Sequence, residues 1–227
     1  MPNIKIAIDG PASSGKSTTA KNAAEKLDMI YIDTGAMYRA VTYCWLISGN
    51  EFNEENVSDL LSEHDLDFHF GQNKTRVFLD ENEITDKIRK QEVTKNVSKI
   101  SALKAVRDHM VKIQRKIANA DGAILDGRDI GTVVFPDADL KIFLVASIDS
   151  RAERRYNEIV RQGENADLND IKKKLIERDL FDSSRQISPL IKAKDAIEID
   201  TSDLTIAEQT KLVVNMAEEI IKNKNNR

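Results

Sequence analysis

The chain has 227 residues, of which 41% are hydrophobic and 32% are charged, and this composition is typical of a soluble globular protein with one core. Its formal net charge of −4 argues against a general binder of nucleic acid polymers or anionic membranes, because both need a basic surface. No apolar run approaches the length of a membrane span, the charged start does not match a secretory signal, and the single cysteine, Cys44, excludes an internal disulfide. We therefore expect a reducing, cytoplasmic setting.

The first predicted elements are a strand and a helix joined by a glycine-containing loop. Residues 4–9 form an apolar run of strand length, and a helical pattern of small apolar residues begins at Ser17. Between them Gly10, Gly15, Lys16 and Ser17 fit the pattern G-x-x-x-x-G-K-[ST]. In that setting backbone N–H groups and the positive helix end face phosphate oxygens, Lys16 reaches the β- and γ-phosphates, and the Ser17 hydroxyl holds Mg²⁺. The stretch predicts the binding of a nucleoside triphosphate.

The next pair is a short strand at 29–32 and a helix with apolar side chains over 37–47. Asp33 or Thr34 can cap this helix. Arg39 then lies in the first turns, where a cation opposes the helix dipole. Two explanations stay open from the local sequence: Arg39 binds an anion there, or it pairs with Asp33 or another acid.

The character of the chain changes between residues 51 and 89. A polar helix, two short strands and two turns are predicted at 53–62, 66–70, 76–79, 71–74 and 80–83. These elements indicate a small antiparallel meander inserted into an otherwise alternating strand–helix chain. His64 and His69 fall here without a partner at metal-ligand spacing, and we interpret them as surface or edge-strand residues.

Residues 94–119 are predicted to be helical, with a core stripe at three- and four-residue steps. A buried strand, 123–126, then ends in Asp126. Because the nucleotide site of proteins with this phosphate loop includes an apolar strand ending in Asp, Asp126 is the candidate support for Mg²⁺. The following loop carries Arg128 and Asp129 beyond the carboxyl end of the strand, where ligands bind in open α/β sheets. The alternative is a loop closed by an Arg–Asp pair.

The last third of the chain alternates again between strands and helices. Strands are predicted at 140–146 and 197–200, and helices at 150–163, from about 168 to 187, and at 205–222. The first of these helices carries several arginines, which we interpret by default as a solvated, charge-paired face. These are Arg151, Arg154, Arg155 and Arg161.

On the helix that begins near residue 168, Arg178, Asp182 and Arg185 share one face. They form either a ladder of ion pairs within the helix or a polar comb over a ligand, and the local sequence does not separate the two.

With these segments assembled, the chain resembles the bacterial cytidylate kinases, P-loop enzymes that phosphorylate CMP and dCMP with ATP. The resemblance covers nearly the whole length, in motifs at residues 8–18, Asp33–Arg39, Asp126–Val134, Phe135–Ala138, Arg178–Asp179 with Asp182 and Arg185, and Ser188–Leu190. It implies an α/β fold with three layers, the P-loop NTPase fold, around a mostly parallel central sheet. It also implies one domain over 1–227 that contains a CMP-binding subdomain at about 63–92 and a helical lid at about 151–186.

The resemblance further implies which residues form the site. The residues matched to ATP binding are Gly10, Pro11, Ala12, Ser13, Ser14, Gly15, Lys16, Ser17, Thr18, Arg154 and Arg155. The residues matched to CMP binding are Thr34, Tyr38, Arg39, Ser98, Arg107, Arg128, Asp129, Arg178, Asp182 and Arg185. The catalytic set is Lys16, Arg128, Arg185 and Asp126, and the metal site is Ser17 with Asp126 behind it.

Within this set, Arg39 and Arg128 would hold the phosphate of CMP, and Ser98, Arg107 and Asp129 would contact the edge of cytosine. A carboxylate at Asp129 can accept from the amino group of cytosine but repels the carbonyl that uracil carries there. Transfer would proceed in line, without a covalent enzyme intermediate.

The implied partners are therefore ATP with Mg²⁺ and CMP or dCMP, with no nucleic acid polymer and no membrane, and we expect a monomer. A kinase for AMP, shikimate or dephospho-coenzyme A is the alternative within the same class. A GTP-dependent switch is a third possibility, but the chain has no Asn-Lys-x-Asp motif, since the nearest stretch, 73–76, lacks the Asp.

Overall fold

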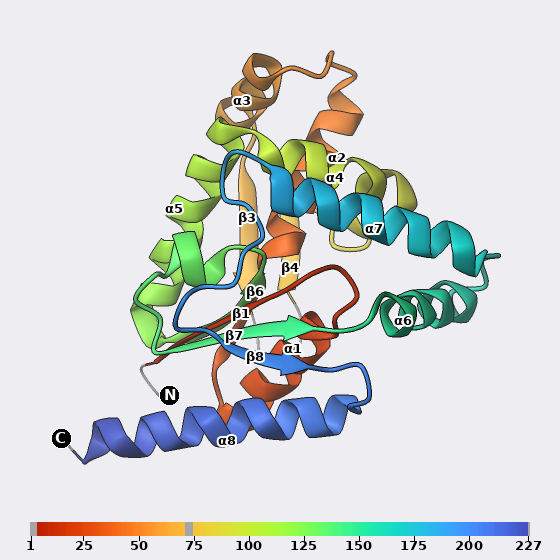
Figure 1. The fold of residues 1–227 in the computed structure, drawn as a ribbon. Coiled ribbons are helices and arrows are strands. Elements are labelled where there is room, and N and C mark those ends of the chain that lie inside the picture. Colours follow the sequence, from red (N-terminus) through yellow and green to blue (C-terminus); the bar gives the residue numbers. More distant parts are fainter. Residues whose placement is uncertain (1–3, 71–74, 227) are drawn as a thin grey trace.

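The computed structural model describes residues 4–70 and 75–226 (Figure 1), so the turn predicted at 71–74 lies outside the described residues. The strands are β1 (Lys5–Asp9), β2 (Ile30–Asp33), β3 (Leu66–Phe70), β4 (Thr75–Leu79), β5 (Asn82–Glu83), β6 (Ala123–Gly127), β7 (Leu140–Val145) and β8 (Ile197–Asp200). The α-helices are α1 (Lys16–Leu27), α2 (Thr34–Ser48), α3 (Glu54–Glu63), α4 (Gln91–Ala102), α5 (Lys104–Asp121), α6 (Ile148–Arg161), α7 (Leu168–Ser184) and α8 (Ile206–Asn225).

The central sheet has five parallel strands in the order β2-β6-β1-β7-β8. Because all five run the same way, their carboxyl ends meet at one edge. The register places Asp9 opposite Gly127 and Asp33 opposite Asp126. Three carboxylates, on β1, β2 and β6, therefore lie at the edge from which the phosphate loop departs.

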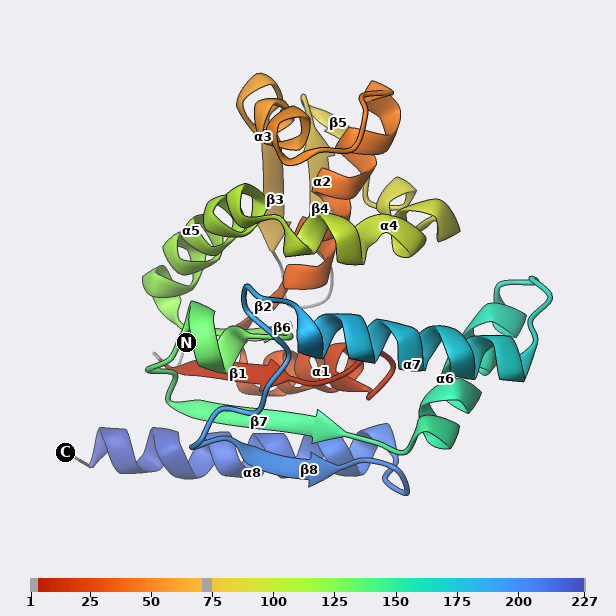
Figure 2. The ribbon, with the colours of Figure 1, turned by 45° about the horizontal axis from the view of Figure 1, so that its top comes forward.

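Strand residues alternate between two cores, one on each face of the sheet. Ile6 and Ile8 pack with the small residues of α1 and with Val213 of α8. Ala7 and Leu125 face the other way, into a larger core with α2 and α5. Figure 2 shows the resulting layers, with α8 along one side of the sheet and α5 and α2 on the other. This confirms the predicted three-layer α/β fold.

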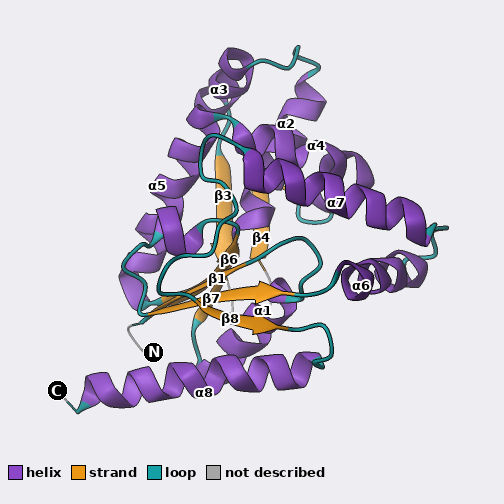
Figure 3. Ribbon diagram, in the orientation of Figure 1, coloured by secondary structure: helices purple, strands orange, loops and turns teal. Residues whose placement is uncertain are grey.

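The inserted meander is a separate antiparallel sheet in the order β3-β4-β5. Its strands run across those of the main sheet (Figure 3), and Val77 and Leu79 join the core of α2 and α5. The turn predicted at 80–83 is shorter than expected. Asp80 and Glu81 both have positive φ, and two such residues make a tight hairpin turn that leaves Asn82 and Glu83 free to pair as β5.

The helices α6 and α7 form a pair that extends from the sheet edge, seen at the right of Figure 1. A small core joins the pair to the phosphate loop: Ala12 packs with Ala152 of α6 and with Ile171 and Leu175 of α7. No helix within the described residues is both long and apolar enough to cross a membrane.

Candidate active site

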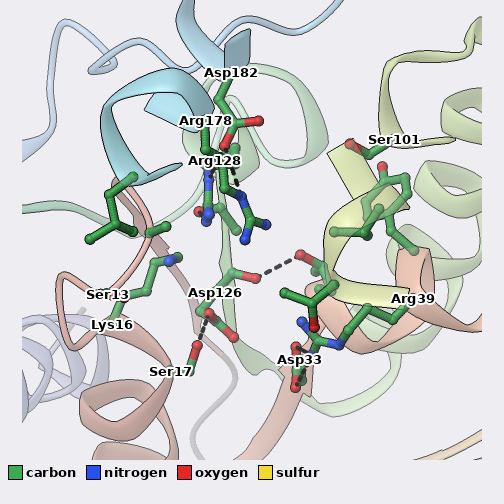
Figure 4. Close-up of a pocket in the computed structure, with 18 of the residues that line it drawn as sticks. Ser13, Lys16, Ser17, Asp33, Arg39, Ser101, Asp126, Arg128, Arg178 and Asp182 are labelled. Carbon is green, nitrogen blue, oxygen red and sulfur yellow. Dashed lines mark hydrogen bonds and ion pairs between the residues drawn. The ribbon is translucent and has the colours of Figure 1, made fainter. Parts of the chain in front are cut away.

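One cavity of about 540 Å³ opens at the carboxyl edge of the main sheet. The phosphate loop and the start of α2 form its floor, α4 and α5 one wall, and α6, α7 and the loop after β6 the other. Figure 4 shows Lys16 and Asp126 pointing into it opposite Arg128 and Arg178. Segments far apart in the sequence therefore bring charged groups to one place.

The phosphate loop has the backbone that its motif requires. Gly10 has φ 151°, and a Cβ there would lie 2.2 Å from the main-chain oxygen of Leu144, so no other residue fits. Gly15 has φ 90° and precedes α1 without a side-chain cap, so the first N–H groups of α1 remain available to an anion.

Lys16 is the buried cation of this loop. Only 7% of the residue is exposed, and its Nζ donates to the main-chain oxygen of Pro11 at 3.1 Å. Burial, together with the nearby Arg128 guanidinium, lowers the pKa of Lys16 to about 7, although Asp126 acts in the opposite direction. Lys16 is thus poised to gain charge when phosphates enter.

Three hydroxyl groups fix Asp126 at the end of β6. Ser17 Oγ donates to one carboxylate oxygen at 2.6 Å, Tyr31 donates to the other at 2.7 Å, and Thr34 donates to the main-chain oxygen at 2.7 Å. Burial, with the neighbouring Asp33 carboxylate, raises the pKa of Asp126.

The donor set around Ser17 fits Mg²⁺. Hydroxyl and carboxylate oxygens are the hard ligands that this ion prefers, and the hydrogen bond to Asp126 leaves the Ser17 lone pairs free. Within the described residues no cluster of three or more His, Cys, Asp or Glu could hold a metal. Nucleotide oxygens and water would therefore have to supply most ligands, as is usual for Mg²⁺ bound with a nucleotide.

Asp33 caps α2 and also holds two arginines. One of its carboxylate oxygens accepts the Ala36 N–H at 2.8 Å, the helix cap predicted from the sequence. Arg39 pairs with Asp33 at 3.1 Å, and Arg89 lies 3.7 Å from it. Both arginines line the cavity, so the pairing expected for Arg39 and its access to an anion occur together.

A buried corner of the cavity contains Arg107, Asp129 and Tyr38. The Arg107 guanidinium donates to the Asp129 carboxylate and to the main-chain oxygen of Ser101, and it lies 5.4 Å from the centre of the Tyr38 ring. Arg185 approaches Asp129 to 3.9 Å. Among the described residues, the Tyr38 hydroxyl and Arg107 Nε are buried and have no hydrogen-bond partner, so both can bond to a ligand.

The comb on α7 faces the same cavity. Arg128 Nε donates to Asp182 at 2.8 Å, and Arg178 Nε lies 4.0 Å from the same carboxylate. Burial alone would raise the pKa of Asp182, but Arg128 and Arg178 outweigh burial and lower it. Arg178, Asp182 and Arg185 all line the cavity, so they can contact a ligand there, and Arg178 also lies near Asp182 within the same helix.

Five residues of the predicted site do not line the cavity: Gly10, Pro11 and Ser14 of the phosphate loop, Ser98 and Arg154. Ser98 is half-buried on α4, whereas Thr94, Val97 and Ser101, on one face of that helix, do line it. Arg154 donates to the main-chain oxygen of Thr201, whose hydroxyl donates to the main-chain oxygen of Ser14 in the phosphate loop. Arg155 does reach the cavity and pairs there with Glu158 at 2.6 Å.

The interpretation of the α6 arginines as a solvated face was wrong for Arg151, of which 7% is exposed. Local spacing did not reveal it, because its partners come from distant parts of the chain. Sequence reasoning also missed Arg89 and Ser101. Ser101 could have been found by its helical spacing from Thr94, whereas nothing near Arg89 marks it.

Comparison with known proteins gives a consistent result. The family model described as cytidylate kinase matches residues 6–219. A cytidylate kinase of Leuconostoc mesenteroides is 49% identical over 97% of this chain and 99% of the relative, and one of Enterococcus faecalis is 48% identical over 96% and 97%. Among solved structures, an uncharacterised protein from Eubacterium ventriosum shares the fold alone, with a TM-score of 0.51, 14% identity, and coverage of 95% of this chain and 98% of its own.

Proposed function

Because the chain belongs to the cytidylate kinase family and so transfers a phosphoryl group from ATP to CMP or dCMP, we propose that the cavity described above is where the two nucleotides meet. One observation carries this assignment. Lys16, in the phosphate loop, and the group Arg128, Arg178 and Asp182 line the same cavity from opposite sides. A donor phosphate held at Lys16 would therefore face an acceptor held by the arginines.

On the donor side, the phosphate loop binds ATP through its N–H groups and Lys16. The open N-terminus of α1 supplies donors with a fixed orientation, and Lys16 supplies a charge close to the transferred group. Arg155 reaches the same space from α6. The groups do not have to reorient when charge develops, so they stabilise the transition state.

On the acceptor side, Arg39 and Arg128 hold the phosphate of CMP. Both are paired with carboxylates in the free chain, Arg39 with Asp33 and Arg128 with Asp182. The phosphate exchanges partners with them, and Arg178 and Arg185 add charge nearby. Because a phosphate oxygen is already a nucleophile near neutral pH, the reaction needs position and neutralised charge and no protein base.

Ser17 and Asp126 would hold Mg²⁺, which when bound neutralises charge between the β- and γ-phosphates. The Ser17 hydroxyl offers an oxygen ligand, and Asp126 orients that hydroxyl by accepting its proton in a hydrogen bond. Tyr31 and Thr34 keep Asp126 in place.

Base selection belongs to the buried corner around Asp129. Arg107 and Asp129 present a donor and an acceptor side by side, which matches the acceptor and amino groups on the edge of cytosine. Ser101 lines the cavity beside them, and we propose its hydroxyl as a further contact to the edge of cytosine. The contact predicted for Ser98 stays a prediction.

The CMP-binding subdomain at about 63–92, which contains the meander, and the helical lid at about 151–186 are proposed to close over the two nucleotides. Arg89 and Arg155 line the cavity from these segments, so closure would bring more charge to the phosphates and exclude water. We also propose that the monomer is the active unit.

The test is a coupled assay of ATP consumption over a panel of acceptors that includes CMP, dCMP, UMP, AMP and shikimate. CMP and dCMP should give a kcat/KM at least about tenfold above the others, because one good edge contact is worth about 1–3 kcal/mol. Equal turnover of AMP or UMP would overturn the assignment of the corner around Asp129.

A further inference from the structure

Arg151, near the start of α6, is buried and makes three polar contacts. Its Nε donates to the main-chain oxygen of Ala146, and one terminal nitrogen donates to the main-chain oxygen of Ala12 at 3.2 Å. The same nitrogen pairs with Asp179 at 2.5 Å. Arg151 therefore joins the end of β7, the phosphate loop and α7.

Asp179 lies on the helix that carries the groups of the acceptor side, so its contact with Arg151 bears on their position. Arg178 is the preceding residue and Asp182 lies one turn further along, and both line the cavity on the acceptor side. Asp179 points instead toward α6. Whatever fixes Asp179 thus fixes the helix from which the acceptor groups project.

Apolar packing reinforces the polar link. Ala12 of the phosphate loop packs in one core with Ala152 of α6 and Leu175 of α7, and the two alanine side chains allow the elements to lie close together. The guanidinium of Arg151 holds the same three elements together beside this core.

We propose that Arg151 is a positioning residue that sets the phosphate loop and α7 at the separation needed for in-line transfer, by bonding Ala12 and Asp179 with one guanidinium. The inference rests on the proposed function, since that function assigns the loop to the donor and α7 to the acceptor. Arg151 does not itself line the cavity, so it acts through the two elements it joins.

Physical reasoning predicts an effect on the rate rather than on binding. Each nucleotide keeps its own contacts when Arg151 is lost, but the reacting atoms are no longer held at the productive distance. A misplacement of about 1 Å costs roughly 100-fold in rate. The planar guanidinium of arginine directs its N–H groups at several fixed acceptors at once. The ammonium of lysine is a compact point charge and does not reproduce this geometry.

The experiment compares Arg151→Gln, Asp179→Asn and the double variant with Arg161→Gln, an exposed arginine at the other end of the same helix. For each, kcat and both KM values are measured, and the Kd of ATP and of CMP are measured separately by calorimetry. Both single variants should lose about tenfold or more in kcat while each Kd changes by less than about threefold. The double variant should be no slower than the slower single, because the two side chains act as one unit.

Arg151→Lys adds a variant that keeps the charge and should recover only part of the kcat. Arg161→Gln should equal the wild type. Additive losses in the double variant, an unchanged kcat, or a Kd for ATP that weakens as much as kcat falls would each overturn the inference, the last by making Arg151 a ligand of ATP. Asp179 is partly exposed, so its variant tests the link even if Arg151→Gln does not fold. A wild type without preference for CMP would overturn the assignment of the corner around Asp129 and not this link, because the kcat measured with any accepted monophosphate still tests the link.

Discussion

At the scale of single residues, Lys16 has the clearest physical signature. Burial and Arg128 lower its pKa to about 7, so near neutral pH it is only partly charged before a nucleotide binds. Bound phosphates favour the charged form and must raise this pKa. Nucleotide binding and protonation of Lys16 are therefore linked.

ATP binding should take up protons at pH 7.5. With a pKa of about 7, Lys16 is about one quarter protonated at that pH, and the bound state is nearly fully protonated. Calorimetry in buffers of different ionisation enthalpy measures the number of protons. The uptake should shrink at pH 6, where the free lysine is already charged, and Lys16→Met should lack this contribution. An equal uptake in the variant would contradict the assignment.

Lys16→Ala should reduce kcat by about 10²–10³-fold, because it removes a preorganised charge from the transferred group. Far-UV circular dichroism and the melting temperature should remain close to those of the wild type, since no apolar packing is lost. Unfolding of the variant would show that the lysine is structural.

Asp129→Asn should narrow the preference for CMP over UMP by about tenfold. The amide retains one acceptor but no longer repels the carbonyl of uracil. The measurement is the ratio of kcat/KM for the two acceptors, with Asp137→Asn, outside the cavity, as control. An unchanged ratio would place base selection elsewhere.

Several site residues could be predicted because a motif fixes their backbone. Gly10, Gly15 and Lys16 belong to a loop whose conformation its motif determines, and Asp33 is one of the two caps, with Thr34, that the sequence predicts before a helix. Arg151 could not, because its partners at positions 12 and 179 are brought together only by the tertiary fold.

At the scale of elements, the loop after β6 depends on a carboxylate from β1. Asp9 accepts the N–H groups of Ile130 and Gly131, both at 2.8 Å, and so fixes the backbone that follows Arg128 and Asp129. Its burial raises its pKa to about 7, despite these hydrogen bonds. The acceptor loop is thus attached to the strand that also carries the phosphate loop.

Asp9→Asn should lower the free energy of unfolding by about 1–3 kcal/mol, because one N–H of the loop then faces an amide donor. The KM for CMP should rise more than the KM for ATP. Asp139→Asn is a matched control, since Asp139 accepts the Lys5 N–H at the other end of β1. Urea unfolding and steady-state kinetics measure the two effects, and equal losses in Asp139→Asn would contradict a specific role for Asp9.

Most elements could be predicted from the periodicity of the sequence, including the two longer strands of the meander and the strand that carries Asp126. The turn predicted at 80–83 is two residues longer than the observed hairpin turn at Asp80 and Glu81. Neither position is occupied by glycine, the residue that usually marks a positive φ. The break between α4 and α5 lies at Leu103, where the backbone is extended. No proline or glycine occurs there, so the sequence does not indicate the break.

At the scale of the whole molecule, the cavity is bordered by the phosphate loop at the edge of the main sheet, by α4 and by the α6–α7 pair. Whereas the meander shares the large core with α2 and α5, the α6–α7 pair contacts the phosphate loop through the small core of Ala12, Ala152, Ile171 and Leu175. Small interfaces of this kind permit domain closure on ligand binding.

The radius of gyration should decrease when ATP analogue and CMP are bound together, and by less with either alone. Small-angle X-ray scattering measures this change. Hydrolysis of ATP without CMP should be a small fraction of the kinase rate, because water is excluded only from the closed state. An unchanged radius with both ligands would contradict closure of the two parts.

The pairing of Asp33 with Arg39 and Arg89 has a consequence for small anions. An incoming anion competes with a carboxylate that already pairs with these guanidinium groups, so the attraction of opposite charges alone adds little binding energy. Inorganic phosphate carries no nucleobase whose contacts could offset the loss of the ion pairs with Asp33, whereas CMP carries cytosine. The Asp33 carboxylate therefore weakens the binding of small anions. The enzyme should tolerate millimolar phosphate with little inhibition.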